Sequence, residues 1–427
     1  MNKIKDYKHL YKATEHSAHP NLLNKTVKNL KIKKMEILKL FCKSLISPIL
    51  VIFSNKILVD KNNIIYIGNK KKLSNEFEIF CNHSFFKEYY IIDDSMFNIT
   101  RLSVKKELIY EYLRDYTLLI YLLVVEGSFE NKIRAMYSLI FLKHYYKIRS
   151  LNLNSECKLL NLFSGSQIGH ILNHQLKIFG GRSFIYSWGS NVASEEQKIV
   201  SGDVALLKNK YEKELYSIRK QYIVGNISYN QELKKKSINR LKENINLLFI
   251  DTCENKNFDD ISKFEFYKNI FIILLKFDYV SVNIRMHPGS EISTVQKLIE
   301  IFDSERINIT CDNVSLEQTC TMYDAVINVN SSLSALYVLN YMPIINLFPL
   351  YFNMYENTCS KNVYKQFFDL PGKNIYFIDD LFDLLCSVKK INKFLNDFTG
   401  YDKYRCEYIP KSGKDTADEI AKVMLSI

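Results

Sequence analysis

The stretch Val282–Asn346 constrains the fold of this 427-residue chain more than any other. Apolar runs over Val280–Ile284, Ala325–Val329 and Pro343–Phe348 predict three strands, and the segments between them have helical spacing. Strands and helices that alternate at this pace form a parallel α/β sheet. Ligands of such sheets lie beyond the carboxyl ends of the strands. We therefore expect the ligand where the first two strands end.

The first of these strands ends at a candidate phosphate-binding turn. Arg285 and His287 follow it, and Pro288 begins a tight Pro-Gly turn that would hold the imidazole outward. A histidine in this place can donate a hydrogen bond to a phosphate oxygen or protonate a leaving group. The alternative is an ordinary surface turn that contains a histidine.

The second strand leads directly into Asn330, Ser331 and Ser332 and then into a helix. Free backbone N–H groups and the helix dipole favour an anion at such a junction, and the two hydroxyls add donors. The alternative is that one serine only caps the helix. Because two serines stand beside a histidine-bearing strand end, we interpret this loop as phosphate-binding.

The length of the chain predicts two domains, since single cores rarely grow beyond 250–300 residues. We expect an N-terminal α/β domain at 1–230 with a basic lead-in, and a C-terminal Rossmann-like domain at 231–427. Both halves contain alternating strands and helices; the predicted elements are strands Asn62–Gly68, Glu76–His83, Tyr89–Asp94, Lys158–Phe163, Ser183–Ser187, Val200–Lys208, Gln221–Val224, Asn246–Asp251 and Ile307–Thr310, and helices Glu107–Tyr146, Ile171–Phe179, Asn209–Arg219, Phe258–Lys276, Ser293–Asp303, Ser315–Met322 and Asp415–Ser426.

Composition limits the class of protein. A hydrophobic content of 47% excludes a disordered chain, and a formal net charge of +12 favours anionic partners such as nucleotides or anionic lipid surfaces. Nine cysteines without a Cys-x-x-Cys pair argue against a zinc site or a disulfide framework and favour a cytoplasmic protein. The apolar stretch Ile37–Phe53 contains two lysines and a proline, so we expect a buried helix and strand; the alternative is a basic helix on a membrane surface.

The turn R-M-H-P and the stretch D-A-V-I-N-V-N-S-S-L-S-A-L-Y-V-L-N-Y-M-P-I-I together resemble the HP and SS motifs of bacterial surface-polysaccharide glycosyltransferases of the GT-B fold. That group includes sialyltransferases, polysialyltransferases, capsule Kdo transferases and related teichoic-acid glycerophosphotransferases. The resemblance covers about Val200–Leu350, including Y-E-K-E-L-Y and Q-Y-I-V-G-N. It implies a GT-B-like α/β fold with two Rossmann-like domains facing a cleft. It also implies that His287, Ser331 and Ser332 hold the phosphate and ribose of a cytidine monophosphate sugar.

In the sialyltransferases of this group, a first-domain acidic pair followed by glycine supplies the catalytic base. Asp93 and Asp94 are the nearest match, although a serine replaces the glycine; the alternative is a strand-end pair that bonds a turn. Mutual repulsion between adjacent aspartates could raise one pKa toward neutrality. His170, in the loop S-G-S-Q-I-G-H, is the rival base and is faintly similar to a glycine-rich loop of lipid-linked GT-B enzymes.

We therefore expect an inverting glycosyltransferase that moves a sugar, first of all a CMP-activated sialic acid, from a nucleotide donor to a capsule or lipooligosaccharide acceptor. Adjacent aspartates on a strand point apart and no Asp-x-Asp stands in a metal-like context, so we expect neither metal nor cofactor. The expected partners are a nucleotide sugar, a glycan or glycolipid acceptor and the anionic inner face of the cytoplasmic membrane, with no nucleic acid. The alternatives are a polyol-phosphate transferase or sugar-nucleotide epimerase on the same fold, and a basic nucleic-acid or membrane-binding module.

Overall fold

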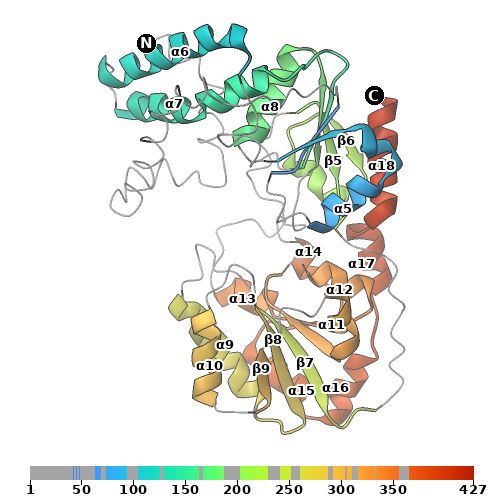
Figure 1. Cartoon of the computed structure of the whole chain (residues 1–427). Helices are drawn as coiled ribbons and strands as arrows, with labels where there is room; N and C mark the ends of the chain where they lie inside the picture. Colours follow the sequence, from blue (N-terminus) through green and yellow to red (C-terminus); the bar gives the residue numbers. More distant parts are fainter. Residues whose placement is uncertain are drawn as a thin grey trace. The chain divides into compact units, whose positions relative to one another are not determined.

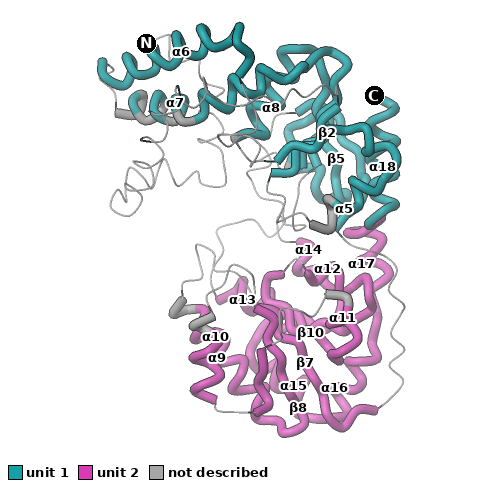
Figure 2. Tube along the Cα trace, in the orientation of Figure 1, with its two compact units in different colours: residues 1–188, 194–228, 413–427 teal, residues 189–193, 229–412 magenta. Residues whose placement is uncertain are grey.

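The chain forms two compact units in the computed structural model, which Figure 2 colours separately. The structure describes residues 63–68, 74–93, 104–125, 129–162, 167–186, 202–228, 241–251, 260–286, 292–302, 305–309, 316–331, 333–354 and 365–427, with the single residues 42, 45 and 48. Unit 1 contains 1–188, 194–228 and 413–427, and unit 2 contains 189–193 and 229–412. Each unit has its own six-stranded sheet, in which every pairing between strands is parallel.

The sheet of unit 1 has the strand order β2-β1-β3-β4-β5-β6. Its helices cover both faces (Figure 1). In chain order the elements are β1 Ile64–Tyr66, α5 Ser74–Asn82, η3 Ser84–Glu88, β2 Tyr90–Ile92, α6 Lys106–Val125, α7 Phe129–Arg149, β3 Lys158–Asn161, α8 Gln167–Ile178, β4 Arg182–Tyr186, β5 Val204–Leu207, η6 Lys210–Leu215, β6 Lys220–Ile223 and α18 Gly413–Ser426.

The sheet of unit 2 has the order β9-β8-β7-β10-β11-β12. Numbered along this unit, that is 3-2-1-4-5-6, the Rossmann order, in which the chain changes direction between β7 and β10. The elements are β7 Ile245–Ile250, α9 Asp260–Leu274, β8 Val280–Arg285, α10 Ile292–Phe302, β9 Ile307–Ile309, α11 Leu316–Met322, β10 Ala325–Asn328, α12 Ser334–Leu339, β11 Ile344–Asn346, α13 Phe348–Met354, α14 Lys365–Phe368, β12 Lys373–Asn374, α15 Ile378–Leu385, α16 Val388–Leu395 and α17 Tyr401–Tyr408. The predicted α/β class with two Rossmann-like units is confirmed.

Side-chain alternation along the strands builds two separate apolar layers in unit 1. Ile64 and Tyr66 of β1 pack toward helices α6, α7 and α8, whereas Ile65 packs into the opposite layer with α5 and α18. Successive residues of a strand point to opposite faces, so one short apolar strand serves both layers. This is why the central strands are apolar throughout instead of alternating with polar residues.

The C-terminal helix α18 belongs to unit 1, although the predicted division assigned all of 231–427 to the second domain. Ala417, Ile420 and Met424 are buried in the same layer as Ile65 and Leu160. The apolar face of a helix must be buried against some core, but its sequence does not say which one. The final helix therefore returns to the first sheet.

Two secondary-structure predictions in unit 1 are wrong. The run Glu76–His83, predicted as a strand, lies in α5 and the turn after it, because Phe80 is buried against η3 and the C-terminal helix. The predicted helix Asn209–Arg219 is the short 3-10 helix η6, which begins where the side chain of Asn209 accepts a hydrogen bond from Tyr211 N. A short run with a few apolar residues does not by itself distinguish a strand from a helix.

Candidate active site

Three neighbouring strands of unit 2 bring the predicted donor-binding residues to one edge. Ile250 of β7 lies opposite Arg285 of β8 on one side and opposite Asn328 of β10 on the other. Paired residues at one level project to the same face, and two strand spacings separate their backbones by about 10 Å. Asn330 and Ser331 follow Asn328 and are half-buried, as is Arg285. The three described donor-side residues therefore share the carboxyl edge at the point where the chain direction changes.

The loop after β10 is fixed by Asn328 and Ser331. The side chain of Asn328 accepts a hydrogen bond from Ser331 N at 3.1 Å, and the Ser331 hydroxyl accepts one from Leu333 N at 3.3 Å. Ser331 O also accepts from Ser334 N, the first residue of α12. Ser331 therefore stabilises the turn before α12, whose N-cap is Leu333 and has no side-chain cap hydrogen bond, and the Ser331 hydroxyl keeps a proton to donate. Because α12 has only 6 residues, its dipole would stabilise an anion at this loop less than we expected from the sequence.

Asn328 itself is a residue that the sequence analysis missed. Its side chain is fully buried, and Asn328 Nδ2 has no hydrogen-bond partner within the described part of the chain. A buried amide donor without a partner is uncommon and costs free energy unless something accepts from it. An asparagine as the last residue of an apolar strand was the available signal.

Arg285 lies close to α12. Burial raises the pKa of Tyr337 to about 12, and the positive charge of Arg285 is among the influences that oppose this rise. The Tyr337 hydroxyl lies 3.2 Å from Thr319 Oγ1 in the buried interior. The Arg285 charge therefore acts on α12, the helix that follows the loop of Asn330 and Ser331.

A buried ion pair that was not predicted from the sequence supports the same edge of the sheet. Asp251 follows β7, and its backbone N–H donates to Arg285 O at 2.9 Å. Lys263 Nζ of α9 lies 3.0 Å from Asp251 Oδ1, and the Tyr267 hydroxyl donates to the same oxygen at 2.8 Å. Both charged side chains have 0% exposure, so the carboxyl end of β7 is held by a network closed to water.

Two predicted residues of unit 1, Asp93 and His170, lie near the carboxyl edge of the first sheet. Asp93 follows β2, and His170 is in the first turns of α8, which begins after β3. Strand β1 separates β2 from β3, so the two strand ends are about 10 Å apart. Asn161, the last residue of β3, was not predicted from the sequence as a site residue. Its buried amide donates to Gly169 O at 3.3 Å and to Asn173 Oδ1 at 3.2 Å and so anchors α8.

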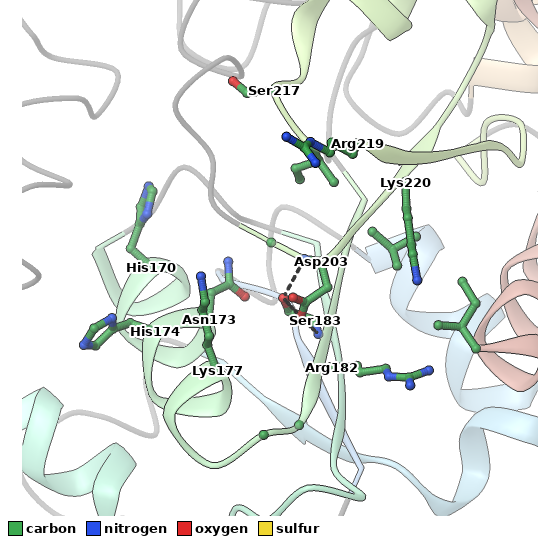
Figure 3. A pocket seen from close by; sticks show the side chains of 16 residues that line it. His170, Asn173, His174, Lys177, Arg182, Ser183, Asp203, Ser217, Arg219 and Lys220 are labelled. Carbon is green, nitrogen blue, oxygen red and sulfur yellow. Dashed lines mark hydrogen bonds between the residues drawn. The ribbon is translucent and has the colours of Figure 1, made fainter.

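His170 also lines a groove of about 940 Å³ along α8. Figure 3 shows His170, Asn173, His174 and Lys177 on one side of the strands and Arg182 and Lys220 on the other, with Ser183 and Asp203 between them. Ser183 donates to Asp203 Oδ2 from its backbone N at 2.8 Å and from its hydroxyl at 3.0 Å. The groove joins the candidate base to the amino ends of β4, β5 and β6.

Asp94, His287, Pro288 and Ser332 lie outside the described residues, so their predicted roles stay predictions. Within the described ranges, no three His, Cys, Asp or Glu side chains gather as a metal site would require. The helices described in both units include none with the length and apolarity needed to cross a membrane.

No protein-family model matches this chain, and no curated protein matches it in sequence. Solved structures of several proteins are similar to it. A putative UDP-N-acetylglucosamine 2-epimerase from Listeria monocytogenes aligns with a TM-score of 0.48 and 9% identity over 86% of this chain and 96% of that one. The wall teichoic acid polymerase TagF aligns with a TM-score of 0.48 and 12% identity over 93% and 98%. The lipopolysaccharide outer core galactosyltransferase WaaB aligns with a TM-score of 0.45 and 11% identity over 86% and 100%.

Proposed function

We propose that this chain is a glycosyltransferase that takes a sugar from a nucleotide donor and transfers it to a bacterial surface glycan. The observation that carries the proposal is the register of β8, β7 and β10, with Arg285 and Asn328 on either side of Ile250. A guanidinium, an amide and a hydroxyl beside the change of chain direction suit the phosphate and ribose of a nucleotide. The motif resemblance adds His287 and Ser332 to this set.

The proposed reaction is an inverting displacement without a metal. The acceptor hydroxyl attacks the anomeric carbon of the donor, the glycosidic C–O bond forms, and the bond from that carbon to the phosphate oxygen breaks. The departing phosphate carries the electron pair and is stabilised by Arg285, His287 and the hydroxyl of Ser331. A base in unit 1, Asp94, Asp93 or His170, takes the acceptor proton.

The donor is proposed as a CMP-activated sugar, first of all sialic acid, because the paired motifs resemble those of the sialyltransferase group. The proposed acceptor is a capsule polysaccharide or lipooligosaccharide, and the proposed location is the cytoplasm, with peripheral contact to the anionic membrane. The contact would come from the lysines of the N-terminal 45 residues, outside the described residues. Failure to co-sediment with phosphatidylglycerol vesicles at low salt would refute the membrane contact.

A thermal-shift screen tests the donor site. Wild-type protein is melted with CMP, CDP, UDP and their sugar or glycerol conjugates, and the measurement is repeated on Arg285→Gln and His287→Ala. Each lost hydrogen bond to a phosphate is worth about 1.5–3 kcal/mol, so the nucleotide affinity should fall about tenfold or more. Lys297→Gln, which removes an exposed cation of α10 in the same unit, is the matched control and should leave the shift unchanged.

The outcome of the screen separates the candidate functions. A shift with CMP that is lost in Arg285→Gln supports a CMP-sugar transferase. A shift with CDP-glycerol or a UDP-sugar alone moves the donor to the polyol-phosphate or epimerase class. No nucleotide shift together with salt-sensitive binding of nucleic acid would refute the enzyme and favour a binding module.

A further inference from the structure

The groove along α8 carries more positive charge than its surroundings neutralise. Lys177, Arg182, Arg219 and Lys220 line it and are exposed, and none has an ion pair or side-chain hydrogen bond with another described residue. Asp203 is the single carboxylate side chain in the described lining, and one of its oxygens already accepts two hydrogen bonds from Ser183. The four cations therefore line one groove, Lys177 on one side of the strands and Arg182 and Lys220 on the other, and none is paired within the described chain.

Burial and the positive charge in the groove together lower the pKa values of neighbouring groups. Burial lowers the pKa of His174, and the charge of Lys177 lowers it further. Burial also lowers the pKa of Lys158, the first residue of β3, and the charge of Arg182 adds to that effect. Lys158 instead donates to the carbonyl of Met424. Several positively charged side chains thus lie close together at this edge of the sheet, and a bound anion would be stabilised there.

The groove reaches away from the edge at which the transfer is proposed. Its cations lie at the end of α8 and at the amino ends of β4 and β6, whereas His170 lies near the start of α8. Residues 170, 173, 174 and 177 share one face of the helix over about 10 Å of its length. A ligand long enough to follow this face would extend from the candidate base toward Arg182 and Lys220.

The lining also selects among anionic ligands. Asn173, Ser183 and Ser217 contribute an amide and hydroxyls, which match the hydroxyl groups of a sugar. No phenylalanine, tyrosine or tryptophan occurs in the described lining, so the stacking surfaces that bind single-stranded nucleic acid are missing from it. Of its aliphatic residues, Val204 is fully buried, Ile218 is 6% exposed and Ile427 is half-buried, which leaves little apolar surface there for insertion into a bilayer.

We propose that the groove along α8 binds an anionic glycan chain, whose carboxylate or phosphate groups contact Lys177, Arg182, Arg219 and Lys220. As an identification of the acceptor, this inference rests on the proposed function. As a binding site, it stands without the transfer reaction. The repeated negative charges of such a chain would bind the cations along the groove. One end of the chain would then lie near His170.

The test is equilibrium binding of fluorescent oligogalacturonate to the full chain, measured by anisotropy at low and at physiological ionic strength. Arg219→Ala/Lys220→Ala should weaken binding about tenfold at low salt, since each exposed charge contributes up to about 1 kcal/mol. Lys213→Ala/Lys414→Ala removes two exposed cations of unit 1 outside the groove lining and should bind like wild type. Circular dichroism checks that each variant is folded.

Three results would overturn the proposal. The first is equal affinity of Arg219→Ala/Lys220→Ala and the control variant. The second is binding of a neutral maltodextrin as tight as that of oligogalacturonate. The third is stronger binding to phosphatidylglycerol vesicles that is lost in Ile178→Ser/Phe179→Ser, because these exposed side chains directly follow Lys177 and would then mark a membrane surface. The assay contains no donor, so its failure is separable from failure of the nucleotide screen.

Discussion

Lys263 Nζ lies 3.0 Å from Asp251 Oδ1, and neither side chain has any exposure to solvent. This pair joins helix α9 to the carboxyl end of β7, one residue beyond Ile250. Asp251 N also donates to Arg285 O. The ion pair therefore fixes the backbone of Arg285, the residue proposed to bind the donor phosphate. A fully buried pair of this kind stabilises only while both partners and their hydrogen bonds are present.

Lys263→Met should therefore destabilise unit 2 by about 3–5 kcal/mol, since it leaves the Asp251 carboxylate buried without its cation. The measurement is urea unfolding followed by circular dichroism. Asp251→Asn/Lys263→Met removes both charges and should recover part of the loss. Lys268→Met on the same helix, whose side chain is 38% exposed, should change stability by less than about 0.5 kcal/mol. Equal stability of Lys263→Met and wild type would contradict this account.

The strands at the centre of both sheets could be predicted from the sequence, and the polar network behind them could not. Apolar runs such as Ile245–Ile250 and Val280–Arg285 mark buried parallel strands directly. Lys263 stands in a helix where nothing local distinguishes a buried lysine from a solvated one. Its partner is 12 positions away, and only the packing of α9 on the sheet brings them together.

Some residues of the candidate site could likewise be predicted from the sequence, and others could not. Arg285, Asn330 and Ser331 were found because the ends of parallel strands meet at one edge, which follows from strand order alone. Asn328 and Asn161 were not predicted, because an asparagine after an apolar run usually indicates only where a strand ends. Their hydrogen bonds depend on how the following loop or helix folds back, which the local sequence does not show. The return of α18 to unit 1 could not be predicted either, since its apolar face fits more than one core.

Asn161 should control the position of α8. Its amide donates to Gly169 O and Asn173 Oδ1 in the buried interior, so Asn161→Ala leaves both acceptors without this donor. We expect a loss of about 1–3 kcal/mol in unfolding free energy. A double-mutant cycle with Asn173→Ala measures the coupling, which should exceed about 0.5 kcal/mol. Additive losses would show that the two amides act independently.

Gly372 and Gly400 should respond differently to alanine although both have positive φ, +103° and +86°. A Cβ at Gly372 would lie 2.3 Å from Ile344 O of β11, which is backbone and cannot move aside. At Gly400 the nearest atom within 4 Å is Pro371 Cβ at 3.8 Å. Gly400→Ala should cost about 1–2 kcal/mol from the dihedral angle alone. Gly372→Ala should cost about 1–3 kcal/mol more, seen as the lower melting temperature of the two variants.

Glu212 should make unit 1 less stable as pH rises. Its carboxylate is buried; Oε2 accepts from Lys208 N at 2.7 Å, and Oε1 has no partner among the described residues. Burial raises the pKa of Glu212 above the ordinary value of 4.5, while the charge of Lys208 and the hydrogen bond from its backbone oppose the rise. In the pH window from 4.5 up to the folded-state pKa, the folded protein keeps a proton that the unfolded chain has lost. The unfolding free energy therefore falls as pH rises through this window.

Glu212→Gln keeps the acceptor for Lys208 N and removes the buried charge. Unfolding free energies of wild type and variant, measured from pH 4.5 to pH 8, should diverge in favour of the variant as pH rises. Glu214→Gln, which removes the exposed carboxylate two residues later, should run parallel to wild type over the same range. Parallel curves for Glu212→Gln and wild type would show that the Glu212 carboxylate is not destabilised by its burial, and that Lys208 compensates its charge in full.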